Sequence, residues 1–495
     1  MPTLDAPLTA VAANLDARIA ELAAKYLPLA KEMLAEAIRI PADYVDKPLE
    51  QGGDPLCGTS NHEFPRLEYL RKKIIEIKAV RNAEDVFFDG FGNLVWWVED
   101  PNDGIDPTKK KVVYIDGHTD TVKPLRAQWK ERVVGADCYD GLIDKAKIDK
   151  DFLKKELGWV PPESEWEHLL FGRGSADQLG GVISAAIATK ILVELTGEGA
   201  LRGAIVRSYG TACEEDNDGA GPMYLNREVF PTAGPEIVPD VVILTDGTGC
   251  SKRGALGIYR GQRGRMQIEV TVTGKSCHGS MPWEGKNPFE FGGAIVKEAA
   301  EAYEKRDGFL DDPFLGHGTR TASWARLDTP SDCAVPEKLV FRFDRRLTIG
   351  ETPEQAVADV DRLSSVAAAR EAGLKVDVSV PVYTDASWKG YVLNNPQIYL
   401  GWVTPEEHPS IRAAVESRPG DRVTDLHVWR VGKGKYACIL SLTTGAALDA
   451  RSEWGDGDRW RWWPAASRCR TRCLPRSSAP LHVTSPMEDA GIFCA

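Results

Sequence analysis

The sequence lacks several features that would assign it to common classes. No apolar run is long enough to cross a bilayer, since the nearest candidate, residues 185–195, is far shorter than the ~20 residues required. The N-terminus lacks the basic-then-apolar order of a secretory signal. Basic residues are not in excess, because 61 Lys and Arg oppose 73 Asp and Glu. The net charge of −12 argues against nucleic acid or a membrane as the main partner.

Cysteine is sparse as well. Ten cysteines, mostly scattered over 495 residues, predict reduced thiols in a cytoplasmic protein rather than a disulfide framework. What the chain does have is the apolar and charged content of a soluble globular protein. Its length predicts two or more domains.

The first half of the chain alternates strand and helix patterns. We expect helices at 15–37 and 181–195, and strands at 85–99, 111–116, 203–211 and 240–245, with those at 111–116 and 240–245 buried. This order predicts an α/β domain with a largely parallel sheet. Residues 141–164 form a polar insertion with a helical stretch, which we interpret as a surface excursion.

From about residue 256 the pattern changes. Alternating strands are predicted at 265–273, 338–348 and 374–382, and helices at 288–302 and 354–368. A small α+β domain with one covered sheet face would give this pattern. We therefore assign 1–255 and 378–417 to the first domain and 256–377 to a domain inserted into it.

Five short segments carry the candidate chemistry: DGHTD at 116–120, GRGSAD at 172–177, CEED at 213–216, TDGT at 245–248 and CHGS at 277–280. Most lie where an apolar strand gives way to a polar or Gly-rich turn. In open α/β sheets, ligands bind at the carboxyl ends of the strands. Amide hydrolysis by metal-activated water needs a few His and carboxylate ligands and one spare carboxylate as base. The first four segments supply that set.

Two of these segments contain the simplest ligand candidates. His118 and Asp120 are two residues apart and face the same side of a strand end, so the carboxylate can hold the second ring nitrogen of a metal-binding imidazole. The alternative is a loop histidine bonded to a turn carboxylate. Asp177 follows a Gly-rich turn and could bridge two metals, or it could simply cap the following helix.

The remaining candidates are also open to two interpretations. Glu214 and Glu215 directly follow a buried strand, where two unpaired carboxylates would be costly. If one glutamate is a metal ligand and the other is the general base, neither carboxylate is left without a role. The alternative is that both lie in a solvated loop. Asp246 is a ligand or the start of a turn. His278 in the inserted domain could reach across to polarise a carbonyl, or it could be a surface histidine.

Taken together, residues 15–417 resemble the metal-dependent aminoacylases, dipeptidases and carboxypeptidases of peptidase family M20. The selenium-metabolism hydrolases are the most similar subgroup. The motifs most specific to this resemblance are YRGQRGRM at 259–266, SCHGS at 276–280 and FDRRLT at 343–348. The resemblance implies a zinc-binding α/β domain with an inserted dimerisation (lid) domain. It also implies a homodimer that hydrolyses small peptides or N-acyl amino acids.

The resemblance further implies a role for each candidate residue. Two Zn²⁺ ions, or Co²⁺ or Mn²⁺ in their place, would be held by His118, Asp177, Glu215 and Asp246. His118 and Asp246 would bind the first ion, Glu215 the second, and Asp177 both. Glu214 would be the general base, and Asp120 would orient His118.

The family also suggests two residues that meet the substrate. His278 would stabilise the oxyanion across a dimer. Arg346 would take the free carboxylate of the substrate, a task that suits a planar guanidinium. The alternative for Arg346 is a surface arginine paired with Asp344.

The C-terminal part departs from the family. In M20 proteins the chain after a segment like EEHP at 406–409 returns to the first domain and supplies a last histidine for the second metal, which we do not find here. Residues 421–444, within a unit spanning 418–446, instead resemble a fragment of the cytoplasmic domain of cation diffusion facilitators and predict a β-hairpin. A lone hairpin of this size is marginally stable.

Residues 447–495 form a low-order tail that is rich in Arg, Trp and Pro at 451–476 and resembles out-of-frame translation. A basic tail that binds nucleic acid is the alternative. If a rearrangement or frameshift replaced the last catalytic segment, the second metal would be weakly held and hydrolysis impaired. The competing hypotheses are an inactive dimeric remnant and, on the hairpin alone, a metal-sensing module.

Overall fold

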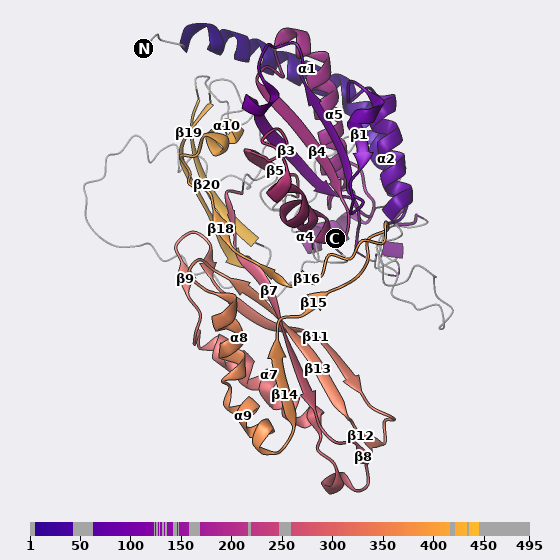
Figure 1. The fold of residues 1–495 in the computed structure, drawn as a ribbon, viewed down its shortest axis with the longest axis vertical. Coiled ribbons are helices and arrows are strands. Elements are labelled where there is room, and N and C mark those ends of the chain that lie inside the picture. The colour runs from indigo at the N-terminus through magenta and orange to yellow at the C-terminus, as the bar shows by residue number, and fades with distance from the viewer. Residues whose placement is uncertain are drawn as a thin grey trace, which may run out of the picture.

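The computed structural model describes residues 5–42, 63–122, 169–215, 219–246, 259–415, 421–432 and 435–444, and parts of 124–157. An α/β domain and an inserted α+β domain each contain a five-stranded sheet (Figure 1). This architecture confirms the predicted fold class.

The sheet of the α/β domain is mixed and has the strand order β1-β2-β4-β3-β5. β3 (Lys111–His118) runs parallel to β4 (Ala204–Thr211) and to β5 (Val241–Leu244). β1 (Val86–Phe88) and β2 (Leu94–Glu99) are antiparallel to their neighbours. The single strand predicted at 85–99 was therefore wrong. Its middle forms a tight turn, because the carboxylate of Asp89 accepts hydrogen bonds from the N–H groups of residues 91–93.

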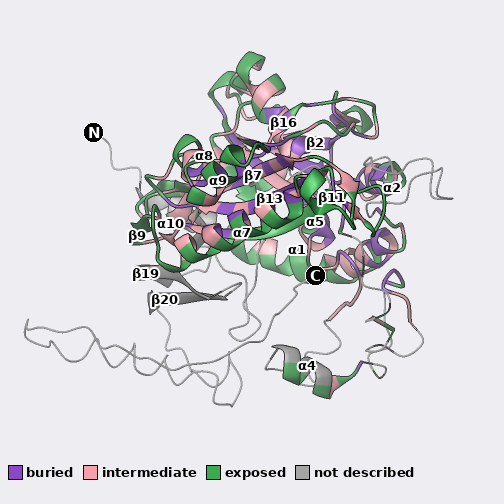
Figure 2. Cartoon of the chain, turned by 90° about the horizontal axis from the view of Figure 1, so that it is seen from below, coloured by how far each residue is buried: buried purple, intermediate pink, exposed green. Residues whose placement is uncertain are grey.

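Helices cover both faces of this sheet. α5 (Leu179–Glu194) lies against β2, β3 and β4, and α1 (Asp5–Ile38) and α2 (Phe64–Glu76) pack outside it. Their shared core includes Leu67, Trp96 and Val182, each with no exposed surface. On the opposite face, Tyr114 and Tyr209 pack with Leu225 of η8 (Leu225–Val229). Figure 2 shows that the buried residues gather in the middle of the molecule and the exposed ones at its outer surface.

The edge strand β5 contradicts one expectation. Residues 240–245 were predicted to form a buried strand, but Val242, Ile243 and Leu244 are 50%, 47% and 55% exposed. β5 pairs only with β3 among the described strands, so its other edge and much of its surface lack a described neighbour. Its apolar composition therefore matches a central parallel strand, although it lies at the margin of the described sheet.

The inserted domain packs helices on one face of its sheet. β7 (Gly264–Thr273) pairs with β13 (Lys338–Leu347), β14 (Lys375–Ser379) and β17 (Ile398–Tyr399), while β11 (Thr319–Asp328) forms the edge beyond β13. Alternate β7 residues, among them Met266, Ile268 and Val270, are fully buried beneath α7 (Pro288–Glu304). This period of two is the sequence pattern that predicted a half-covered sheet.

The helix predicted at 354–368 is broken into α8 (Pro353–Asp361) and α9 (Ser364–Glu371). The carboxylate of Glu298 on α7 accepts the N–H groups of Ser364 and Ser365, at 3.1 and 2.7 Å. This contact satisfies the first donors of a new helix, so a residue from another element sets the break.

Shorter elements complete the described fold. They are η3 (Ala83–Asp85), η4 (Pro107–Lys109), α4 (Lys150–Leu157), η7 (Thr196–Glu198), α6 (Ala220–Tyr224), η9 (Phe230–Thr232), β6 (Gly261–Gln262), β8 (Cys277–His278), η10 (Pro282–Glu284), β9 (Asp311–Asp312), β10 (Gly316–His317), β12 (Ala334–Val335), β15 (Val382–Tyr383), β16 (Asn395–Pro396), β18 (Trp402–Val403) and α10 (Pro409–Val415). α4 corresponds to the helical stretch predicted in the polar insertion.

The predicted hairpin is present as β19 (Asp421–Gly432) paired with β20 (Lys435–Thr444). The tail at 447–495 lies outside the described residues. Within the described part of the chain, no helix has the length and apolarity needed to span a membrane.

Candidate metal centre

The predicted ligands come from the ends of neighbouring strands. His118 ends β3, Glu214 and Glu215 follow β4, and Asp246 follows β5. Asp177 lies in the turn that leads into α5. Because β4, β3 and β5 are adjacent and parallel, their carboxyl ends meet at one edge of the sheet, where ligands of open α/β sheets bind.

The structure brings these side chains together in two overlapping groups. Ligand atoms of His118, Asp177 and Asp246 all lie within 4.8 Å of one another, and so do those of His118, Glu214 and Glu215. His118 is shared by both groups. An imidazole among carboxylates is a donor set that suits Zn²⁺, Co²⁺ or Mn²⁺.

His118 is held at both ring nitrogens. Nε2 lies 2.8 Å from Oδ1 of Asp177, and Nδ1 lies 2.9 Å from the main-chain carbonyl oxygen of Asp120. The Asp120 carboxylate is farther from Nδ1, at 3.4 Å. The closest orienting contact is therefore made by the backbone of Asp120, not by its side chain.

The Asp120 carboxylate has a second task. It is fully buried, and its two oxygens accept the N–H groups of Glu214 and Glu215 at 3.2 and 2.9 Å. This links the turn after β3 to the turn after β4. The position of the adjacent glutamates therefore depends on the same residue that contacts the histidine.

Negative charge is concentrated in this cluster. Burial, together with repulsion from Asp120 and Glu215, raises the pKa of Glu214 to about 8. Burial and the charges of Asp177 and Asp120 raise the pKa of Glu215 to about 7. Such groups resist ionisation unless a cation is near, so a divalent ion would relieve the repulsion.

The other members of the cluster titrate differently. Burial disfavours the imidazolium, but hydrogen bonds to Asp120 and Asp177 outweigh it and raise the pKa of His118 well above its usual value. The same hydrogen bond lowers the pKa of Asp177. Desolvation of its carboxylate and the charge of Asp177 raise the pKa of Asp246, although Asp246 as a residue is exposed.

Glycines allow the elements around the cluster to approach closely. Gly174 has φ +84°, a left-handed conformation that suits glycine, in the turn before Asp177. A Cβ on Gly181 would lie 2.1 Å from Oγ1 of Thr245, so only glycine lets α5 pack this near the end of β5. The Thr245 hydroxyl donates to Oε1 of Gln178 at 2.8 Å and joins the turns that carry Asp246 and Asp177.

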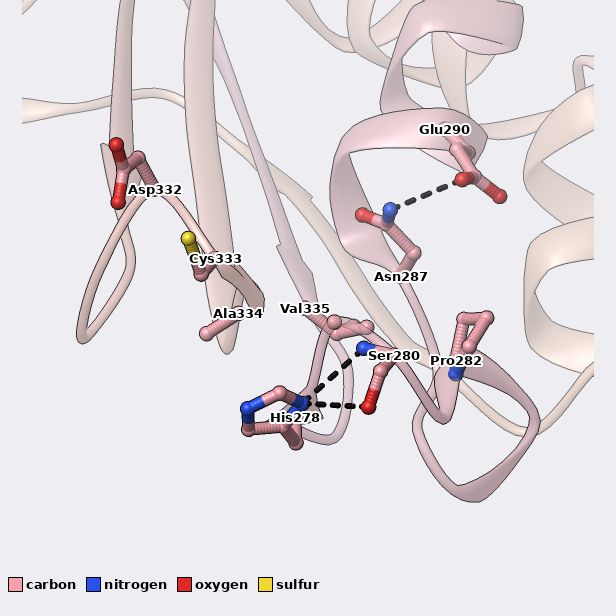
Figure 3. A pocket seen from close by; sticks show the side chains of 10 residues that line it. His278, Ser280, Pro282, Asn287, Glu290, Asp332, Cys333, Ala334 and Val335 are labelled. Atoms are coloured by element: carbon pink, nitrogen blue, oxygen red, sulfur yellow. Dashed lines mark hydrogen bonds between the residues drawn. The ribbon is translucent and has the colours of Figure 1, made fainter.

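His278 lies apart from this cluster. It belongs to β8, which Figure 1 places at the end of the inserted domain that is far from the α/β domain. There it lines an open pocket of about 500 Å³ with Asn287, Glu290 and Cys333 (Figure 3). Its Nδ1 lies 2.8 Å from the hydroxyl of Ser280, and the ring is otherwise exposed. Within one chain, His278 therefore does not reach the cluster.

Arg346 pairs with Asp344, as the alternative to a substrate-binding role predicts. Its Nε and Nη2 donate to the two carboxylate oxygens of Asp344, at 2.8 and 3.1 Å. Arg265 also contacts Asp344, at 3.4 Å. The Arg346 side chain is still 36% exposed, so it remains accessible to a ligand.

The sequence analysis missed two acids near the cluster, the half-buried Asp116 and the buried Glu63. Asp116 belongs to the first segment, but no role was assigned to it; burial raises its pKa to about 6. Glu63 is 1% exposed and contacts the turn after β4. The only sequence signal for Asp116 is an acid inside an apolar strand, and Glu63 has none, because an acid before Phe-Pro is typical of an ordinary helix start.

A family model matches the inserted domain. Residues 260–371 match the peptidase dimerisation domain of the M20 type. Over 256 residues the chain is 37% identical to YgeY of Escherichia coli strain K12, covering 52% of this chain and 58% of that protein. The chain thus spans somewhat less than three fifths of the length of the first curated relatives that it matches.

Two solved structures share the arrangement. Human carnosine dipeptidase 1 is 14% identical, covers 81% of this chain and 84% of its own, and has a TM-score of 0.51. The M20 family metallo-carboxypeptidase of Sulfolobus solfataricus is 14% identical, covers 77% and 81%, and has a TM-score of 0.50. At this identity the likeness concerns the fold alone, and it agrees with the α/β domain and inserted domain described above.

Proposed function

We propose that the protein is a metal-dependent amide hydrolase of the M20 type. The observation that carries the proposal is the convergence of His118 with two pairs of carboxylates at one sheet edge. Three of these acids and the histidine suffice as ligands, which leaves Glu214 free to act as base. The matched dimerisation domain and the metallopeptidase neighbours support the same class.

The metal ions would be held by His118, Asp177, Glu215 and Asp246. A bound divalent ion lowers the pKa of water and polarises the amide carbonyl. Glu214 would take the proton from the attacking water and return it to the leaving nitrogen. In the metal-free chain burial raises the pKa of Glu214 to about 8, and a divalent ion beside it would lower that pKa toward the range that suits a base.

His278 would act on the site of a partner subunit. Its position at the far tip of the inserted domain supports an action in trans rather than within its own chain. In a homodimer, each tip would cover the metal centre of the other chain and donate a hydrogen bond to the developing oxyanion. Ser280 holds the other ring nitrogen and would fix the orientation of the imidazole.

Arg346 would bind the free carboxylate of the substrate. The substrates that we propose are small peptides, as the names of the dipeptidase and carboxypeptidase neighbours suggest, or N-acyl amino acids. Binding would require the guanidinium to share or exchange its contact with Asp344. We also propose a cytoplasmic location and a resemblance to the selenium-metabolism subgroup; the likeness of 421–444 to cation diffusion facilitators stays a prediction.

An inactive remnant is the second candidate. Each of the two ligand groups found among the described residues contains His118 as its only nitrogen donor, so two metals would compete for one imidazole. We propose that the second ion is therefore weakly held, which would impair hydrolysis. In that case the protein would bind at most one metal tightly.

Hydrolysis of dipeptides and N-acyl amino acids, measured with added Zn²⁺, Co²⁺ or Mn²⁺, separates the two candidates. The Glu214→Gln variant is the matched control because it keeps the shape of the side chain and removes the base. A metal-stimulated rate that disappears in the variant supports the hydrolase. Equal rates in both proteins support the remnant.

A further inference from the structure

The side chain of Glu63 is buried but does not cap its own helix. Glu63 directly precedes α2 and has helical backbone angles, yet its carboxylate makes no capping hydrogen bond. It lies instead against the turn after β4, where both oxygens are 3.2 Å from the N–H of Cys213. Oε2 is also 3.6 Å from the sulfur of Cys213. A buried carboxylate thus accepts a hydrogen bond from a residue 150 positions away.

Cys213 has an uncommon backbone conformation. Its φ of +56° is left-handed, which is unfavourable for a residue with a side chain. Glu214 and Glu215 follow it directly. The N–H groups of these three consecutive residues all point to carboxylates, that of Cys213 to Glu63 and the next two to Asp120. Such a run of N–H groups binds anionic groups well.

The start of α2 also contacts Thr119, the residue that directly follows β3. Arg66, three residues after Glu63, is fully buried and donates to the carbonyl oxygen of Thr119 at 2.7 Å. The Thr119 hydroxyl lies 3.4 Å from Oε1 of Glu63. One helix start therefore contacts the residue after His118 and the residue before Glu214.

We propose that Glu63 is a positioning residue for the metal centre. By accepting the N–H of Cys213, it stabilises the left-handed turn that directs Glu214 and Glu215 toward His118. This inference rests on the proposed function, because it assumes a metal centre whose ligands must be positioned. The contacts of Glu63 themselves do not depend on whether the protein hydrolyses a substrate. A residue that only fills the core would not need to contact this N–H group with both oxygens.

The test compares Glu63→Gln with Glu68→Gln. Both substitutions are on or next to α2, but Glu68 pairs with Arg71 at the surface. Glu63→Gln should weaken Co²⁺ binding, followed by visible absorption, roughly 10- to 100-fold, the usual effect of losing a partner behind a ligand. Glu68→Gln should leave Co²⁺ binding unchanged. An equal loss in both variants, or no loss in Glu63→Gln, would overturn the inference.

A second variant separates positioning from general destabilisation. Glycine adopts a left-handed conformation without steric cost, so Cys213→Gly should restore part of the Co²⁺ affinity in the Glu63→Gln background. A merely structural role for Glu63 predicts no such rescue. If the double variant binds Co²⁺ as weakly as the single one, the turn is not what Glu63 controls.

Amide hydrogen exchange gives a readout without metal and without a variant. The wild-type N–H groups of residues 213–215 should be protected to the same degree as those of β4. Fast exchange there would contradict the inference even if Co²⁺ binds. Protected amides in a wild type that binds no Co²⁺ would support the inference and count against the proposed function.

Discussion

Glu214→Gln is expected to stabilise the metal-free protein while it abolishes hydrolysis. In the folded chain the pKa of Glu214 is about 8, against an ordinary value of 4.5. Because the folded pKa is the higher one, the folded state binds more protons than the unfolded state between these two values. The free energy of unfolding therefore falls as the pH rises from about 4.5 toward about 8.

The size of the effect follows from the two pKa values. From pH 6 to pH 8 the unfolded glutamate is ionised throughout, whereas the folded one is still half protonated at the upper end. At ~1.4 kcal/mol per pH unit, Glu214 alone costs the wild type about 2 kcal/mol of stability over this interval. Glutamine has no charge to lose, so the variant should lack this part of the pH dependence.

Urea unfolding at pH 6 and pH 8, with a chelator present and tryptophan fluorescence as the signal, measures the difference. Glu68→Gln is the control, because a hydrogen bond from Arg71 lowers the pKa of Glu68 and keeps it ionised at both pH values. Added Zn²⁺ should stabilise the wild type more at pH 8 than at pH 6, since the cation compensates the carboxylate charge that forms at the higher pH. If Glu214→Gln loses as much stability as the wild type between the two pH values, the electrostatic reasoning is refuted.

Other substitutions test the rest of the site. His118→Asn should reduce bound metal, measured by mass spectrometry, to a trace at both ligand groups; an unchanged metal content would place the ions elsewhere. If His278 acts across a dimer, mixing the inactive Glu214→Gln and His278→Ala proteins should restore about a quarter of wild-type activity, because half of random dimers have one intact site; no recovery would argue against action in trans. Arg346→Lys should raise KM about tenfold, since a lysine cannot replace the bidentate contact, and an unchanged KM would leave Arg346 as a partner of Asp344 only. Leu244→Lys should lower light scattering on concentration without loss of stability, because Leu244 is 55% exposed at the edge of the described sheet; equal scattering would mean that β5 does not cause self-association.

Much of the fold follows from local patterns. β3, β4, β7 and α5 match their predicted ranges within about three residues, because apolar periodicity fixes both the type of element and its buried face. The failures have tertiary causes. Glu298 of α7 accepts the first N–H groups of α9, and no local pattern contains that contact. At 85–99, the Asp89 turn interrupts residues that are apolar enough for one strand.

Local patterns also predict most of the candidate site, but they do not predict contacts between residues that are remote in sequence. His118, Glu214 and Asp246 lie at or just after the carboxyl ends of apolar strands, so the topology of a parallel sheet was enough to expect them together. Glu63 lies outside that reasoning, because its partner is remote in sequence. His278 lies outside that reasoning as well, because the inserted domain places it far from the cluster within one chain.

The exposed surface of β5 connects the stability of the sheet with the chemistry of the site. A strand of Val and Leu is suited to burial on both faces, but here it borders the described sheet on the side of Asp246. Asp246 is exposed as a residue, although its carboxylate is partly desolvated, so water reaches it more readily than it reaches the buried His118. Any segment that covers this edge would bury apolar surface and lower the local dielectric around Asp246 at once. Completion of the sheet and tight binding of the first metal are therefore coupled, and a chain that leaves β5 open should be both aggregation-prone and weak in metal affinity.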